Sequence, residues 1–269
     1  MGVVLLNAGP TPRVAHNRLY VTLARQLTRR GFHSLRFDFS GIGSSPPRDD
    51  GMPVRNYVRA EAVAAMDHLE RTRGIKHFVL GGLCSGAEVA LHTALRDCRV
   101  RGLLLLNCAF VDRDAGRELV AHAEARAREQ KIGRRFRDSR SWVRLLRGKV
   151  SLSTLARGVA AIFKSSRVAA ASVVPHPAAL DLRPLGERDT AVLALFAEHD
   201  SHWDLLQLTT GQGLVSLGAP SSARVVVVEG ADHTFSFLSS RAELLAQVES
   251  WLESEVEGAV GRAPRAGDG

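Results

Sequence analysis

The sequence contains only three cysteines: Cys84, Cys98 and Cys108. No two of them form a Cys-x-x-Cys pair, so neither a disulfide framework nor a zinc site is expected. Long apolar runs are also missing. The longest, residues 103–111, is interrupted by Asn107 and falls far short of the ~20 residues that a membrane helix needs. The sequence therefore predicts no metal, no cofactor and no membrane span.

The chain also lacks the features of disordered or exported proteins. With 45% apolar and 24% charged residues it has an average globular composition, and its 24 glycines and 10 prolines are too scattered for low-complexity sequence. The first strand-like run, Val3 to Leu6, has no basic flank and is too short for the apolar region of a secretion signal. We therefore expect a cytoplasmic, globular protein.

Basic residues outnumber acidic ones, and this excess of positive charge is concentrated in one segment of the chain. The chain has 36 Lys and Arg against 28 Asp and Glu, a net charge of +8. Residues 113–167 hold 15 of the basic and 5 of the acidic residues, which leaves 21 basic and 23 acidic residues elsewhere. A strongly basic surface favours an anionic partner.

Strand-like and helix-like segments alternate along most of the chain. Strands are expected at residues 3–6, 34–39, 77–80, 100–106, 191–197 and 224–228, and helices at 14–30, 55–73, 86–96, 203–210 and 241–255. Alternation of this kind predicts an α/β fold, with a mostly parallel sheet covered by helices on both faces. Its core would comprise residues 1–111 and 186–256, and residues 257–269 would form a disordered tail.

Residues 112–185 differ in composition, being rich in Arg, Ala and Ser, and we interpret them as a basic helical cap inserted into the core. Helices are expected there at residues 117–130, 141–146 and 151–163. The cap would bind an acyl carrier protein or the phosphates of coenzyme A, unless it is simply a solvated surface. Nucleic acid is disfavoured, because neither a basic sheet interleaved with aromatics nor a recognition helix is present.

A Gly-x-Cys-x-Gly motif joins the expected strand at 77–80 to the following helix. A sharp turn that lifts one side chain out of a sheet crowds its neighbours, and Gly82 and Gly86 would relieve that crowding. The side chain displayed is Cys84, at a helix N-terminus that favours a thiolate. The backbone N–H of Ser85 would face a developing oxyanion. The motif predicts that Cys84 is a nucleophile.

A base and an orienting acid should follow the nucleophile, each just after a strand. Asp200 follows the strand expected at 191–197, and His233 follows the one at 224–228. Glu198 and Asp204 lie close to Asp200 and are alternatives for the acid. The order and placement of these residues predict a Cys-His-Asp triad.

With these motifs the chain resembles the α/β-hydrolase superfamily. The resemblance covers the whole sequence except the insertion at 112–185 and the tail at 257–269. Residues 6–10, Leu-Asn-Ala-Gly-Pro, stand where the family commonly has a His-Gly oxyanion loop, and residues 38–45 are similar to its Asp-x-x-Gly-x-Gly-x-Ser turn. The opening half is especially similar to the small hydrolases associated with bacterial exosortase systems. A cysteine in the nucleophile motif is shared with polyester synthases and dienelactone hydrolases.

This resemblance implies a role for each motif residue. Cys84 would be the nucleophile, His233 the general base and acid, and Asp200 the residue that holds the imidazole. The backbone N–H groups of Ser85 and Gly9 would form the oxyanion hole, since Pro10 has no N–H.

The sequence departs from the family pattern at its N-terminal side. Asn7 replaces the usual histidine of the oxyanion loop, and the chain begins at what should be the third strand. The first hairpin is therefore expected to be missing. Either the start of the sequence is misassigned, or a partner or a second copy of the chain covers the exposed sheet edge.

These residues point to acyl transfer through an acyl-cysteine, on an ester or a thioester. A thioesterase or esterase is the first hypothesis, and an acyltransferase that moves the acyl group from a carrier-protein or CoA thioester to an alcohol or amine is the alternative. A non-catalytic binding protein of the same fold is a third. Four residues are candidates for substrate contact: Arg13, His16, His202 and Trp203.

Overall fold

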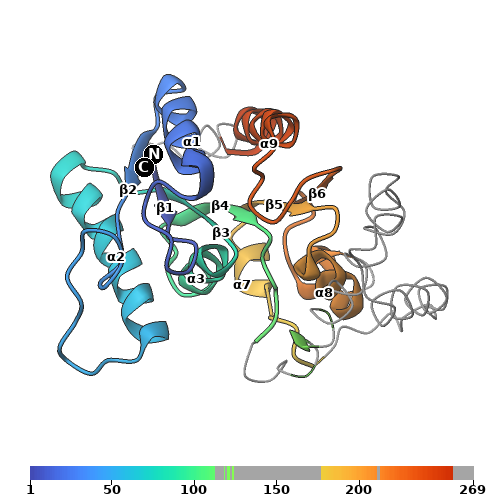
Figure 1. The fold of residues 1–269 in the computed structure, drawn as a ribbon, viewed down its shortest axis with the longest axis horizontal. Helices are drawn as coiled ribbons and strands as arrows, with labels where there is room; N and C mark the ends of the chain where they lie inside the picture. The colour runs from blue at the N-terminus through green and yellow to red at the C-terminus, as the bar shows by residue number, and fades with distance from the viewer. Residues whose placement is uncertain (113–117, 119, 122, 124–176, 211–212, 257–269) are drawn as a thin grey trace, which may run out of the picture.

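The computed structural model describes residues 1–112, 118, 120, 121, 123, 177–210 and 213–256. Within these residues, six strands form one parallel sheet in the order β2-β1-β3-β4-β5-β6 (Figure 1). The strands are β1 (Gly2–Leu6), β2 (His33–Arg36), β3 (Phe78–Leu83), β4 (Val100–Leu106), β5 (Ala191–Ala197) and β6 (Arg224–Val228). The predicted α/β fold is confirmed.

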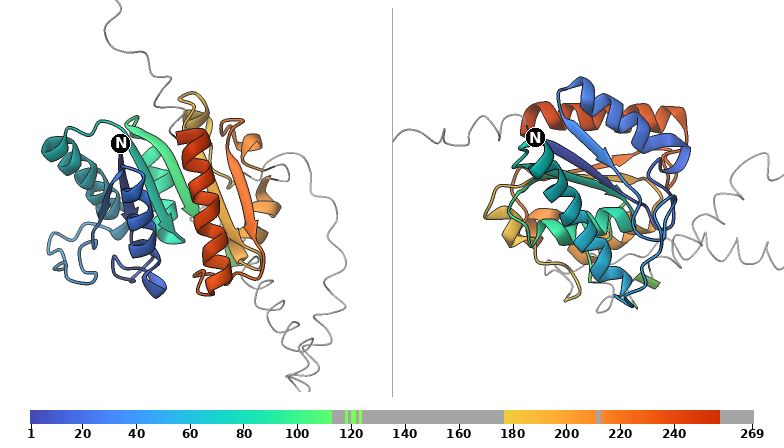
Figure 2. Two further views of the ribbon diagram at one scale, coloured as in Figure 1. Left: turned by 90° about the horizontal axis from the view of Figure 1, so that it is seen from above. Right: turned by 90° about the vertical axis from the view of Figure 1, so that its left-hand side faces the viewer.

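Helices cover both faces of the sheet. They are α1 (Leu19–Arg29), α2 (Val54–Arg73), α3 (Ser85–Ala94), α7 (Arg183–Gly186), α8 (Ser201–Thr210) and α9 (Leu238–Trp251). Short 3₁₀ helices span His16–Arg18 and Leu214–Leu217, and a π-helical turn spans Leu252–Val256. Helices α1 and α9 lie on one face, and α2, α3, α7 and α8 lie on the other (Figures 1 and 2).

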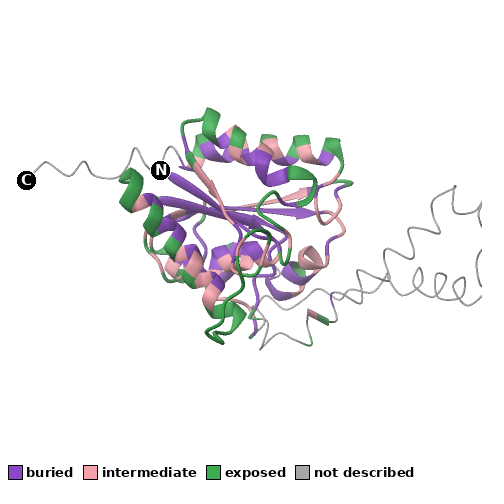
Figure 3. Ribbon diagram, turned by 60° about the vertical axis from the view of Figure 1, so that its left-hand side comes forward, coloured by how far each residue is buried: buried purple, intermediate pink, exposed green. Residues whose placement is uncertain are grey.

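The central strands are buried on both faces. Every residue of β1, β3 and β5 is buried, whereas the helices bury one side and expose the other (Figure 3). Each fully buried Leu, Ile, Val or Phe side chain stabilises the fold by about 1.5–3 kcal/mol relative to its exposed state. The two resulting hydrophobic clusters hold the sheet rigid, so the loops after the strands start from fixed positions.

Two element boundaries near the N-terminus differ from the sequence prediction. The helix expected from residue 14 begins only at Leu19, because Ala15, Asn17 and Arg18 have φ of 56°, 50° and 61°, which an α-helix excludes. The strand expected at 34–39 ends at Arg36. Beyond it the chain turns away from the sheet, and the Phe39 N–H donates to Asn7 Oδ1 at 2.9 Å.

The cap expected at residues 112–185 lies largely outside the described residues, as does the tail at 257–269, and both stay predictions. From Pro177 the chain is described again, and Leu182 and Leu185 are buried in the cluster on the α2 and α3 face of the sheet. Within the described ranges, none of the helices combines the length and the hydropathy of a membrane span.

Candidate active site

The parallel strands bring the predicted catalytic loops to one edge of the sheet. Residues 7–9 follow β1, Cys84 follows β3, Asp200 follows β5 and His233 follows β6. The carboxyl ends of parallel strands are the usual place for ligands in an open α/β sheet. Residues far apart in the sequence therefore meet here.

The turn between β3 and α3 is as crowded as the motif predicts. Cys84 has φ 55° and ψ −119°, a conformation that non-glycine residues rarely adopt. A Cβ on Gly82 would lie 2.4 Å from the Gly86 carbonyl carbon, and a Cβ on Gly86 would lie 2.5 Å from the Leu6 carbonyl oxygen. Only glycine fits at these two positions, and their close contacts hold the Cys84 backbone in place.

The three thiols differ in exposure. Cys84 is partly exposed, Cys98 is exposed and Cys108 is buried. Burial raises the pKa of the Cys108 thiol well above its usual range, so that residue stays protonated and unreactive. Cys84 is therefore the cysteine that combines access, a strained turn and a histidine neighbour.

Asp200 and His233 form the hydrogen bond expected of an acid and a base. His233 Nδ1 and Asp200 Oδ2 are 2.5 Å apart, and Asp200 is 6% exposed. The hydrogen bonds to Asp200 and to the Cys84 side chain raise the pKa of His233 to about 10, although burial opposes this. The imidazole thus joins the carboxylate to the nucleophile, and of the three acidic candidates Asp200 is the one that hydrogen-bonds it.

A second histidine shares the same carboxylate. Asp200 Oδ1 accepts the His202 backbone N–H at 2.9 Å and lies 2.7 Å from His202 Nδ1. Burial disfavours the Asp200 charge, but the bonds from His202 and His233 outweigh it and hold the pKa of Asp200 below its usual range. Because an ionised carboxylate only accepts, each Nδ1 carries the proton in its bond. His233 therefore presents Nε2 to the Cys84 sulfur.

Among the described residues, a group close enough to hold a metal ion consists of Asp200, His202 and His233. Their ligand atoms lie within 4.8 Å of one another. Both Nδ1 atoms are engaged as hydrogen-bond donors to Asp200, however, and that bonding is what a catalytic dyad requires.

The predicted oxyanion donors lie close together. Ser85 is the first residue of α3, so its N–H has no partner within the helix. The Gly9 N–H points toward the same region, but it donates to the Ser85 hydroxyl at 2.7 Å. Both N–H groups can bind one oxyanion only after the Ser85 hydroxyl gives up this bond.

Asn7 anchors the loop that carries Gly9. Its side-chain nitrogen donates to Thr11 O at 2.9 Å and to Asp38 Oδ1 at 3.4 Å. Asp38 is buried and also accepts the Arg13 and Ser44 backbone N–H groups, which makes it the centre of the turn. The asparagine thus fixes the loop through its amide.

Three of the residues expected to contact substrate are engaged elsewhere. Arg13 pairs with Asp38, and His202 binds Asp200. Trp203 packs on Phe196 with ring centroids 5.4 Å apart. His16 is exposed, and its Nε2 lies 3.2 Å from Thr11 Oγ1. Of the four candidates for substrate contact, His16 is therefore the one that lies beside the oxyanion loop and stays exposed.

Tyr20 of α1 ties the two site loops together. Its buried hydroxyl donates to Leu6 O at 2.9 Å and accepts the Leu83 N–H at 2.7 Å. Burial raises the pKa of Tyr20, so the phenol stays neutral. Leu6 immediately precedes the oxyanion loop, and Leu83 immediately precedes the nucleophile.

Asn107 is a site residue that the sequence reasoning missed. It follows β4 and is fully buried, and its side chain donates to His233 O at 2.9 Å and accepts the Ala197 N–H at 2.8 Å. It therefore joins the strand before Asp200 to the loop that carries His233. The feature of the sequence that could have indicated it is a single amide side chain within the apolar run of residues 103–111.

We expect Asn107→Leu to lower the free energy of unfolding by about 2–4 kcal/mol, because it leaves two buried backbone groups without partners. It should also reduce any activity that depends on His233. Urea denaturation and rate measurements test this. Thr93→Val is the control, because the buried Thr93 hydroxyl bonds only within its own helix. Equal effects of the two variants would contradict a positioning role for Asn107.

Comparison with known proteins supports the fold. Residues 3–248 match the model of the alpha/beta hydrolase family. A thermophilic esterase from Thermogutta terrifontis is 20% identical with a TM-score of 0.54, over 94% of this chain and 89% of that one. Proline iminopeptidase from Mycobacterium smegmatis is 19% identical with a TM-score of 0.55, over 96% and 91%. No curated protein matches the chain.

Proposed function

Because the chain belongs to the alpha/beta hydrolase family, we propose that it hydrolyses an ester or thioester through an acyl-cysteine on Cys84. One observation supports the proposal: the His233 ring hydrogen-bonds Asp200, and the Cys84 side chain, which stands on a strained strand-to-helix turn, is close enough to help raise the pKa of that ring. Nucleophile, base and acid in this arrangement are the groups that acyl transfer needs.

In the first half-reaction the proton of the Cys84 thiol is held on His233 Nε2, and the thiolate attacks the substrate carbonyl carbon. The Ser85 and Gly9 N–H groups stabilise the oxyanion once the Ser85 hydroxyl has turned away. The carbon–oxygen or carbon–sulfur bond of the substrate then breaks, and His233 returns the proton to the leaving group. The product of this step is an acyl-cysteine.

In the second half-reaction water replaces the leaving group. His233 takes a proton from the water as the water oxygen attacks the acyl-cysteine carbonyl, and it keeps that proton as the thioester breaks and the Cys84 thiolate leaves. A carboxylic acid leaves. Because a thiolate exchanges with a thioester at nearly equal energy, thioester substrates suit this nucleophile best. If an alcohol or amine replaces water, the same intermediate makes the protein an acyltransferase.

The test is intact-protein mass spectrometry after exposure to a panel of acyl-pantetheine thioesters and simple esters. We expect one acyl adduct in the wild-type protein and none in Cys84→Ala. Cys98→Ala is the matched control, because Cys98 is the exposed thiol that a non-specific acyl donor would modify. An adduct that survives in Cys84→Ala, or no adduct with any donor, would favour a binding protein instead.

We also propose, from residues 6–10 and 38–45, that the chain is related to the exosortase-associated hydrolases. Its basic segment at 113–167 would receive an anionic acyl carrier protein or coenzyme A. That segment lies largely outside the described residues, so the support comes from its charge alone.

A further inference from the structure

His202 is a residue of the site to which the proposed triad gives no role. It is the second residue of α8, two positions after Asp200. The sequence made it a candidate for substrate contact, but its Nδ1 lies 2.7 Å from Asp200 Oδ1. Its side chain is 12% exposed, compared with 38% for His233. The ring therefore lies against the acid and is more enclosed than the ring of the base.

Asp200 caps α8 in addition to binding His233. Its Oδ1 accepts the His202 backbone N–H at 2.9 Å, which is the usual bond from an N-cap side chain to the second residue of a helix. A single bond of this kind leaves the carboxylate free to turn about it. Because the His202 ring donates to the same oxygen from a second direction, it restricts that rotation. Oδ2 then remains for the His233 ring, at 2.5 Å from Nδ1.

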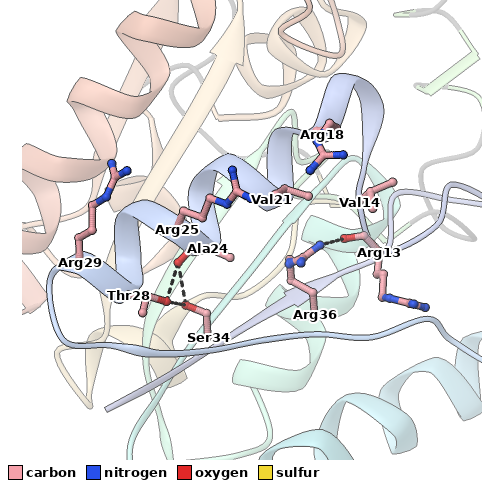
Figure 4. A pocket seen from close by; sticks show the side chains of 10 residues that line it. All are labelled: Arg13, Val14, Arg18, Val21, Ala24, Arg25, Thr28, Arg29, Ser34 and Arg36. Carbon is pink, nitrogen blue, oxygen red and sulfur yellow. Dashed lines mark hydrogen bonds between the residues drawn. The ribbon is translucent and has the colours of Figure 1, made fainter.

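The charge of Asp200 is balanced by imidazoles. Among the described residues, its ion-pair partners are His202 and His233. Arginines gather elsewhere, and five of them line a groove beside α1 (Figure 4). Burial raises the pKa of Asp200, but the hydrogen bonds from His202 and His233 lower it further than burial raises it. Both histidines are therefore needed to keep this buried carboxylate ionised.

The two rings share one carboxylate, so the position of one depends on the other. Their centroids are 5.9 Å apart, with the ring planes tilted by 32°, and each ring bonds a different oxygen of Asp200. We propose that His202 is a positioning residue, which holds the Asp200 carboxylate in the orientation that His233 uses. The inference rests on the part of the proposed function in which His233 activates Cys84. His202 acts through Asp200, as the fourth member of a Cys-His-Asp-His arrangement.

Two substitutions separate the ring donor from the rest of the residue. His202→Leu removes the donor, whereas His202→Asn keeps one, because the asparagine side-chain nitrogen lies about where histidine Nδ1 lies. Both variants retain the backbone N–H that caps α8. A difference between them therefore reports the side-chain bond to Asp200 and not the start of the helix.

The first measurement needs no substrate. Iodoacetamide labels Cys84 of the full chain at about pH 6, below the pKa of about 8.5 of a free thiol, so the rate reports the thiolate that His233 maintains. Mass spectrometry separates Cys84 from the exposed Cys98. We expect His202→Leu to slow the labelling of Cys84 by about 10- to 100-fold, the scale of one hydrogen bond to a charged group. His202→Asn should recover most of this loss.

The second measurement separates positioning from substrate binding. With an acyl-pantetheine donor, His202→Leu should lower kcat and leave KM nearly unchanged, because the ring bonds the acid and not the substrate. The loss should stay smaller than in a variant that removes the Asp200 charge itself. His68→Leu is the control, since it makes the same replacement at an exposed position of α2 and should change neither rate.

Three results would overturn the positioning role: wild-type labelling of Cys84 in His202→Leu, no recovery in His202→Asn, or a higher KM at an unchanged kcat. Failure of the proposed function looks different. If the labelling rates follow the expected order but no donor is hydrolysed, the proposed function fails and the positioning role stands. If Cys84 of the wild-type protein reacts no faster than Cys98, His233 does not activate it, and both proposals fall together.

Discussion

Replacing Cys84 by alanine is expected to lower kcat/KM for ester or thioester hydrolysis by about 10⁴-fold or more, because nothing remains to form the covalent intermediate. The fold should be unaffected, since the residue is partly exposed and alanine keeps the Cβ. Initial rates with a chromogenic ester and an acyl-pantetheine measure the loss. The exposed Cys98 supplies the control: Cys98→Ala should retain full activity.

A serine at the same position separates the nucleophile from the sulfur chemistry. We expect Cys84→Ser to be acylated still, because His233 remains in place, and to direct more of the acyl group to water. Partition between water and an added alcohol or amine measures this. If the partition does not change, cysteine has no special role in choosing the acceptor.

Asp200→Asn is expected to lower kcat by about 10³- to 10⁴-fold, the scale typical when an amide replaces a triad carboxylate. The amide keeps an acceptor for the His202 N–H but provides no charge to stabilise the imidazolium of His233. His202→Gln is the comparison, because that residue bonds the carboxylate without contacting the nucleophile. A loss in His202→Gln as large as in Asp200→Asn would indicate that the second histidine takes part directly.

Asp200→Asn should also change how the stability of the fold depends on pH. The folded His233 holds its proton up to a pKa of about 10, against 6.5 for an unperturbed histidine. Its contribution to the stability of the fold is therefore complete below pH 6.5 and is lost as the pH rises toward 10. Asp200 has a lowered pKa, so its contribution is present above about pH 4 and is lost as the pH falls. The difference in unfolding midpoint between the wild-type protein and Asp200→Asn should therefore be largest between about pH 4 and pH 6.5. This difference should become smaller by about pH 10. A constant gap across this range would contradict the assignment.

The order of strands and helices could be predicted from the sequence because the core strands are nearly continuous apolar runs. Boundaries were missed where polar tertiary contacts decide them. The chain leaves the sheet after Arg36 because Asn7 and Asp38 collect its backbone N–H groups, and no local pattern shows that. The late start of α1 depends on three residues with positive φ, which periodicity does not reveal.

The site was predictable to the extent that its residues stand in motifs. Glycine spacing pointed to the turn at Cys84, and the crowding at Gly82 and Gly86 explains that spacing. The choice among Glu198, Asp200 and Asp204 needed distances, because all three follow the same strand. Asn107 escaped notice because a single polar residue in an apolar run does not show which loops it joins.

The hydroxyl of Tyr20 has a consequence for motion at the site. It is bonded at once to the residue before the oxyanion loop and to the residue before Cys84. Any displacement of α1 would therefore act on both loops together. Tyr20→Phe would remove this link while keeping the ring in its buried place, and the two loops would then be joined by the pairing of β1 with β3 and by the bond from Gly9 to Ser85.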